Sequence, residues 1–161
     1  MTQTEPRDLL ARFWRDLKDL RTGMLGLATE PECGHAQPMT AHFEGDQGPL
    51  YFYAHRGSRI VHAAEQSHEA VFHYVGPKHD LYACVHGEVI VTQDRGAIDR
   101  FWSDEVARWY PHGRGDPDLS LLCFSPHSAQ IWLPSDGAEP KLFGMGRDRE
   151  PPRDVRAEVR L

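Results

Sequence analysis

The sequence predicts a mostly β domain, a small antiparallel barrel with flanking helices. Five short apolar stretches, separated by turns rich in Gly, Pro and Asp, lie between residues 22 and 92. Their close spacing favours a meander of antiparallel strands over a parallel sheet. Two further stretches, residues 9–20 and 97–109, carry apolar side chains at helical spacing and predict the flanking helices.

The composition argues against several classes of partner. The 161 residues carry a formal net charge of -6 and a sequence pI of about 5.9, so we expect neither nucleic acid nor an anionic membrane as a partner. No run approaches the roughly 20 apolar residues of a membrane helix, and no signal peptide is apparent. Cys33, Cys84 and Cys123 are odd in number and far apart, which indicates reduced thiols. We therefore expect one cytoplasmic domain.

The first predicted helix has one apolar face. Thr4 is a candidate N-cap, and Pro6 sits where a first-turn proline is tolerated. Such a face would suit a partner-binding helix, but we favour packing against the domain's own sheet. Its apolar residues are Leu9, Leu10, Phe13, Trp14, Leu17 and Leu20.

The first three strands are predicted at residues 22–29, 35–43 and 50–54. Pro38 interrupts the second of them. Because proline cannot donate a hydrogen bond to a β ladder, this strand should lie at a sheet edge or carry a bulge.

A short helix is predicted over residues 58–65, followed by strands at 69–75 and 81–92. The second of these strands contains Gly87 near its middle. A glycine inside a strand suggests a barrel bend or a close approach of two backbones.

The last predicted elements are a helix over residues 97–109 and two strands at 119–124 and 129–133. We assign residues 1–134 to a single barrel domain that includes the N-terminal helix. Residues 135–161 are rich in Pro, Gly and charge, so we expect a tail that is loosely structured or packed on a partner subunit.

Residues 50–61 combine an aromatic strand, a turn and the start of a helix. The turn His55-Arg56-Gly57-Ser58-Arg59 carries two guanidinium groups and a hydroxyl. Helix-start N–H groups, the Ser58 hydroxyl and a bidentate Arg59 could together bind one phosphate. An ordinary strand-turn-helix with solvated arginines is the alternative.

Several motifs in this order resemble the pyridoxamine 5′-phosphate oxidase-like split-barrel family, in its general stress protein 26-like branch. Phe52 to Ile60 resembles the family's FMN-phosphate segment, and Gln37-Pro38-Met39-Thr40 resembles its Arg-Pro-Met strand. Gly87-Glu88-Val89 and the stretch from Trp109 to Gly113 fit later elements, so that the resemblance covers roughly residues 8–133. It implies an antiparallel split β-barrel of the FMN-binding type, FMN as the cofactor, and a homodimer with the flavin site at its interface.

The resemblance also implies which residues bind the cofactor. Ser58 and Arg59 match the phosphate ligands, while Tyr53 and Ala54 match strand residues beside the flavin. Trp109 either stacks on the flavin or belongs to the core face of its helix. The full set is Gln37, Met39, Thr40, Tyr53, Ala54, His55, Ser58, Arg59, Trp109 and Tyr110.

Two positions depart from the family pattern. Gln37 stands where the family has arginine, and Ile60 stands where it has lysine. The Gln37 amide can still hydrogen-bond flavin or phosphate, but it brings no charge; a polar residue facing water is the alternative. We therefore expect modest FMN affinity.

The function that the resemblance implies is an FMN-dependent oxidoreductase of unknown substrate, since flavin carries its own redox chemistry. A non-catalytic flavin carrier or sensor, a deazaflavin-dependent reductase and a haem-binding member of the same fold are the alternatives. A true pyridoxamine 5′-phosphate oxidase is not expected, because no histidine follows His127 and the tail lacks that enzyme's Arg/His segment. The ten histidines show no strict ligand spacing. A pair of His42 and His86 across strands is the one candidate, and we expect no metal site.

Overall fold

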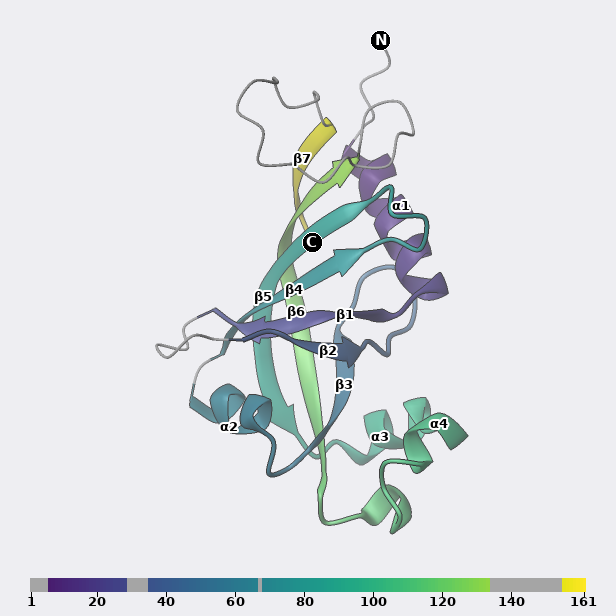
Figure 1. The fold of residues 1–161 in the computed structure, drawn as a ribbon, viewed down its shortest axis with the longest axis vertical. Coiled ribbons are helices and arrows are strands. Elements are labelled where there is room, and N and C mark those ends of the chain that lie inside the picture. Colours follow the sequence, from purple (N-terminus) through teal and green to yellow (C-terminus); the bar gives the residue numbers. More distant parts are fainter. Residues whose placement is uncertain (1–5, 29–34, 67, 134–154) are drawn as a thin grey trace, which may run out of the picture.

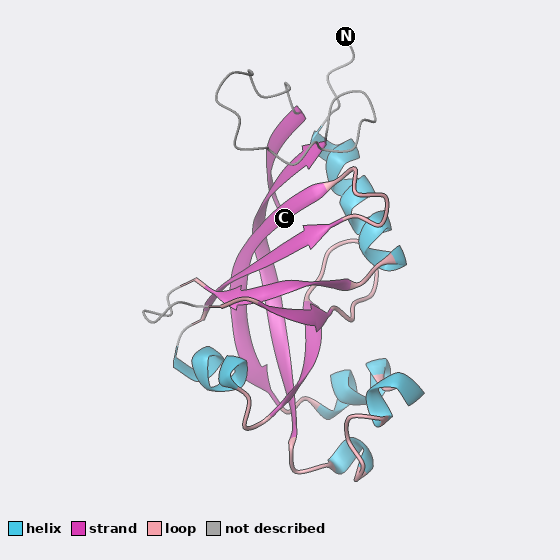
Figure 2. Ribbon diagram, viewed as in Figure 1, coloured by secondary structure: helices cyan, strands magenta, loops and turns pink. Residues whose placement is uncertain are grey.

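The strands form a nearly closed antiparallel barrel with helices at its flanks (Figures 1 and 2). The computed structural model describes residues 6–28, 35–66, 68–133 and 155–161. The sheet follows the order β2-β1-β4-β5-β6-β3, and β7 pairs with β6 beside this path. The strands are β1 (Thr22–Leu27), β2 (Gln37–Thr40), β3 (Leu50–His55), β4 (Glu69–Val75), β5 (Tyr82–Thr92), β6 (Leu119–Leu133) and β7 (Val155–Arg160).

The barrel closes where the chain leaves β2. His42 and Tyr51 exchange two backbone hydrogen bonds of 2.8 Å each, which joins the end of β2 to β3. Since β2 and β3 are the first and last strands of the order, this bridge turns an open sheet into a barrel. Pro38 lies in β2, opposite Met24 of β1, so the expected edge position of this strand is confirmed.

Strand β6 is one continuous strand, where we expected two. Its first half pairs with β3 and its second half with β7, while β5 runs along its other side. The sequence from Ser125 to Ser128 is typical of a turn. In the structure, the register of β5 against β6 shifts there through a bulge between His86 and Gly87, and β6 continues as one strand. The close approach expected at Gly87 is confirmed: a Cβ there would lie 2.2 Å from the Ser125 carbonyl oxygen.

The expectation of a loosely structured tail was wrong for residues 155–160. These residues form β7, in antiparallel register with residues 128–133 of β6. The second half of β6 would otherwise present an unpaired edge, and β7 covers it. Residues 134–154 lie outside the described residues, and packing of the tail on a partner subunit stays a prediction.

Helix α1 (Pro6–Asp19) packs against the barrel, as expected. Its buried face includes Phe13 and Trp14, and the Phe13 ring lies 5.7 Å from that of Tyr74 on β4. The Tyr74 hydroxyl also donates a 2.7 Å hydrogen bond to the Asp16 carbonyl oxygen of the helix. Thr4, the candidate cap, lies outside the described residues. Helix α2 (Arg59–Gln66) follows β3 and buries Ile60, Val61 and Ala64.

The single helix expected over residues 97–109 is broken in two, α3 (Arg95–Phe101) and α4 (Asp104–Ala107), followed by the 3-10 helix η1 (Gly113–Gly115). The apolar spacing continues through the break, but Trp102 is extended and Ser103 caps a new helix by accepting from the Val106 N–H at 3.3 Å. In Figure 1 these short helices lie together beside the lower ends of β3 and β6. No helix in the described ranges is long and apolar enough to cross a membrane.

Candidate functional site

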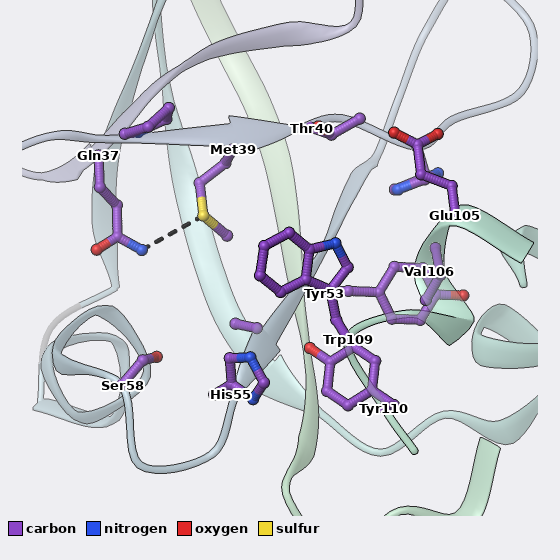
Figure 3. Close-up of a pocket in the computed structure, with 13 residues that line it drawn as sticks. Gln37, Met39, Thr40, Tyr53, His55, Ser58, Glu105, Val106, Trp109 and Tyr110 are labelled. Carbon is purple, nitrogen blue, oxygen red and sulfur yellow. Dashed lines mark hydrogen bonds between the residues drawn. The ribbon is translucent and has the colours of Figure 1, made fainter. Parts of the chain in front are cut away.

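A cleft of about 320 Å³ opens between β2, the end of β3 and α4 (Figure 3). Both strands belong to the closing side of the barrel, and the bridge between His42 and Tyr51 also holds the backbone of His42, which lines the cleft. Its lining contains nine of the predicted cofactor residues: Gln37, Met39, Thr40, Tyr53, Ala54, His55, Ser58, Trp109 and Tyr110.

The turn after β3 carries a buried hydroxyl with no partner. The Ser58 N–H donates to the His55 carbonyl oxygen at 2.9 Å, which closes a tight turn before α2. The Ser58 Oγ faces the cleft and has no hydrogen-bond partner among the described residues. Because leaving a buried hydroxyl unpaired costs free energy, this atom is suited to an incoming acceptor or donor.

Arg59, the tenth predicted residue, does not line the cleft itself. It lines a smaller recess that shares Gln37 with the cleft and also includes Ile60. Ile60 is only 5% exposed and belongs to the main core. A lysine at this position would therefore have to bury its ammonium group or displace the core.

The β2 side of the cleft presents two apolar residues, Pro38 and Met39, between the polar Gln37 and Thr40. Met39 is buried against the core, and its sulfur lies 3.3 Å from the Gln37 side-chain nitrogen. Gln37 is half-buried and points along the cleft wall, as Figure 3 shows, and its role as a cofactor ligand stays a prediction. Thr40 ends the strand at the opposite end of this wall.

Aromatic rings form the other wall. Tyr110 is buried, and the Tyr53 hydroxyl donates a 2.6 Å hydrogen bond to the Ile98 carbonyl oxygen. Burial raises the pKa of Tyr53 to about 12 and also raises the pKa of Tyr110, so both phenols stay protonated at neutral pH. Trp109 is 67% exposed at the mouth of the cleft, which excludes the core position that was the alternative for this residue. Trp102, by contrast, packs against the small core cluster beside α3.

Four lining residues were missed from the sequence: Pro38, His42, Glu105 and Val106. His42 is 8% exposed, and its ring lies 5.2 Å from that of Tyr53. Burial, with a smaller effect of Arg21, lowers the pKa of His42 to about 4, so the imidazole is neutral near pH 7. Glu105 could not be found by helical spacing, because the break at Ser103 changes which residues face the cleft.

The histidine pair considered for a metal does not form. His86 on β5 pairs with Val71 and Ser128, while His42 pairs with Tyr51 on the far side of the strand order. The described part of the chain contains no group of three or more His, Cys, Asp or Glu side chains that could hold a metal ion.

His55, at the end of β3, is held from two sides. Its Nδ1 lies 2.7 Å from the Asp118 Oδ2, and its ring lies 5.2 Å from that of Tyr110. Asp118 is itself fixed, because its carbonyl oxygen accepts from the Arg56 N–H at 2.7 Å and its N–H donates to Asp116 Oδ1 at 2.9 Å. No local sequence pattern signals this pairing, since the two residues lie 63 positions apart.

Comparison with known proteins identifies relatives over nearly the whole chain. The family model described as pyridoxamine 5′-phosphate oxidase-like matches residues 8–147. No curated protein matches the chain.

Three solved structures are similar in both sequence and fold. A protein from Xanthomonas campestris pv. campestris, described as belonging to a general stress family, is 36% identical with a TM-score of 0.76, covering 93% of this chain and 100% of its own. The general stress FMN/FAD binding protein from Xanthomonas citri is 36% identical with a TM-score of 0.74, covering 89% and 99%. A protein described as general stress protein 26 from Jannaschia sp. CCS1 is 28% identical with a TM-score of 0.74, covering 96% and 99%.

Proposed function

Since this chain belongs to the pyridoxamine 5′-phosphate oxidase-like family, with general stress proteins among its relatives, we propose that it is a flavoprotein that binds FMN in the cleft beside β3. The cleft is formed on the split β-barrel that the relatives share. Its proposed activity is that of an FMN-dependent oxidoreductase.

The observation that carries this proposal is the unpaired Ser58 hydroxyl. It is buried without a partner among the described residues, it faces the cleft, and it stands at the start of α2, where helix N–H groups favour an anion. Arg59 follows directly and lines the adjoining recess. A phosphate monoester would give the hydroxyl its missing partner and would draw on the guanidinium as a charged donor.

The remaining lining residues fit a flavin ring system. Met39, Tyr53 and Tyr110 present apolar and aromatic surface, and the exposed indole of Trp109 offers a further face for stacking. Gln37 supplies an amide that can hydrogen-bond a polar ring edge. When bound, the flavin supplies the redox chemistry, while these side chains position it and keep water from one of its faces.

We also propose that the working protein is a homodimer. Trp109 and Ile90 are 67% and 50% exposed, which is unusual for large apolar side chains. Trp109 lines the cleft, and a second copy packed against its exposed indole would cover both the indole and a bound flavin. Sedimentation at micromolar concentration should show a dimer; a monomer across that range would contradict this part of the proposal.

The absorption spectrum of the purified protein tests the cofactor. Reconstitution with FMN should give a flavin spectrum with one flavin per chain, and FMN should bind more tightly than riboflavin because of its phosphate. FAD and a deazaflavin serve as competing ligands in the same titration. A haem spectrum, or saturation by deazaflavin without saturation by FMN, would replace the proposed function by one of the alternatives.

A further inference from the structure

The charge of the proposed phosphate site is incomplete. A phosphate monoester carries roughly -1.5 to -2 charges near neutral pH. Among the described residues that line the cleft and its adjoining recess, Arg59 is the only side chain with a permanent positive charge. Gln37 and Ile60 add none, the buried His42 is neutral, and His35 lines only the recess. One guanidinium therefore leaves part of the ligand's charge unmatched.

His55 is a further source of positive charge in the cleft itself. The 2.9 Å hydrogen bond between the Ser58 N–H and the His55 carbonyl oxygen makes these residues the two ends of one tight turn. Both side chains line the same cleft, and Figure 3 shows them at the same end of it. A group bound to the Ser58 hydroxyl is therefore within reach of the imidazole.

The imidazole has one nitrogen in use and one available. Its Nδ1 is hydrogen-bonded to Asp118, and Nε2 has no hydrogen-bond partner among the described residues. In the neutral ring, Nδ1–H donates to Asp118 and Nε2 can only accept. In the protonated ring, both nitrogens donate, so that Nε2–H can bind a phosphate oxygen while the carboxylate balances the charge.

We propose that His55, protonated and held by Asp118, is a third ligand of the flavin phosphate, beside Ser58 and Arg59. This inference rests on the proposed function. It makes FMN affinity depend on pH, because only the imidazolium donates from Nε2. The contact with Tyr110 holds the His55 ring in place, and the two backbone hydrogen bonds of Asp118 hold its carboxylate partner. The imidazole therefore loses little conformational entropy when a ligand binds.

The charged and titratable groups around His55 are few. Asp118 and Asp116 face it from the loop before β6, the Tyr110 phenol packs on it, and Arg56 precedes Ser58 in the same turn. Backbone hydrogen bonds from Asp118 and His112 lower the pKa of Asp116, which favours its carboxylate form. The phenol stays neutral, since burial raises its pKa. Among these groups, the His55 imidazole is the one whose protonation would turn Nε2 from an acceptor into a donor toward the cleft.

The test is a pair of equilibrium titrations, with FMN and with riboflavin, across pH 6.5 to 8.5. The wild-type protein should lose about tenfold in FMN affinity as the pH rises, while riboflavin affinity, which involves no phosphate, should stay constant. His55→Gln should bind FMN about tenfold more weakly than the wild type at pH 6.5 and should show no pH dependence. Asp118→Asn should also weaken FMN binding at pH 6.5, without changing riboflavin affinity.

The matched control is His73→Gln, on an exposed residue of β4 outside the cleft, which should reproduce the wild-type curve. If the wild type binds FMN but His55→Gln binds it equally well at pH 6.5, the inference is overturned and the proposed function stands. An equal loss of FMN and riboflavin affinity in His55→Gln would also overturn it, because the imidazole would then act on the ring or the fold. No flavin binding by the wild type at any pH would overturn both.

Discussion

The backbones of His42 and Tyr51 exchange two hydrogen bonds of 2.8 Å, and this bridge joins the segment after β2 to β3, where β2 and β3 are the first and last strands of the sheet order. The same bridge turns the His42 side chain into the interior, between Tyr53 and Phe101, where it also forms part of the cleft wall. Barrel closure and the cleft therefore depend on one short segment that follows β2.

Acid should destabilise the protein through His42. Burial lowers its pKa in the folded state to about 4, from an ordinary value of 6.5. Below pH 6.5 the unfolded chain binds a proton that the folded chain does not, so stability is full above pH 6.5 and is lost as the pH falls toward 4. The loss is roughly 3 kcal/mol in the free energy of unfolding.

Urea unfolding of the flavin-free protein between pH 4 and 7 measures this loss. The comparison is His42→Phe, which keeps an aromatic ring beside Tyr53 but cannot titrate. Other groups, such as Asp16, whose pKa burial raises, contribute equally to both proteins and cancel. An acid slope as steep in His42→Phe as in the wild type would show that His42 is not the group responsible.

Gly87→Ala should destabilise the barrel. The added Cβ would lie 2.2 Å from the Ser125 carbonyl oxygen and 2.9 Å from the Pro126 Cα, so the bulge between β5 and β6 would have to move. We expect a loss of at least about 2 kcal/mol in the free energy of unfolding, from overpacking against backbone atoms. Gly57→Ala is the control, because nothing lies within 4 Å of the position that its Cβ would take. Equal stability of the two variants would contradict the close approach.

Ser58→Ala should separate stability from binding. Its hydroxyl is buried without a partner among the described residues, so removing it should leave the free energy of unfolding unchanged or raise it by up to about 1 kcal/mol. FMN affinity should nevertheless fall about tenfold, while riboflavin affinity stays the same. A loss of stability would instead indicate that Ser58 serves to cap α2.

Much of the fold was predictable because local patterns and packing agree. The apolar face of α1 follows from the helical spacing of its side chains, while the edge position of Pro38 and the close approach at Gly87 each follow from one residue. The predictions failed where a non-local contact decided the outcome. No local sequence pattern predicts that β6 continues past Pro126 with a bulge, or that β7 pairs with the edge of β6.

The candidate site also has parts that local sequence predicts and parts that depend on contacts between distant segments. The turn at Ser58 was predictable from its own residues, because it stands between a strand and a helix start; the residues on β2 and β3 were expected only from the family resemblance. The interaction between His55 and Asp118 joins distant segments and left no local pattern. Glu105 faces the cleft only because Ser103 restarts the helix, which a continuous helical pattern does not reveal.

The protein should not oxidise pyridoxamine or pyridoxine 5′-phosphate at a useful rate. A substrate phosphate needs a cationic pocket separate from the one that holds FMN. None of the described residues lining the cleft is a lysine or arginine, and Glu105 adds a carboxylate that would repel such a substrate. Oxygen-dependent formation of pyridoxal phosphate by FMN-loaded protein should stay at the level of free FMN. Turnover of about 1 per second or more would contradict this prediction.

The central claim, that the turn from His55 to Arg59 holds the flavin phosphate, is tested most directly by titrating Arg59→Ala with FMN. A charge-assisted hydrogen bond is worth roughly 1.5–3 kcal/mol, so FMN affinity should fall about tenfold to a hundredfold. Riboflavin affinity should not change. Arg56→Ala removes the same charge from an exposed position of the same turn and should have less than about a threefold effect. If Arg59→Ala binds FMN as tightly as the wild type does, the phosphate lies elsewhere and the proposed site is wrong.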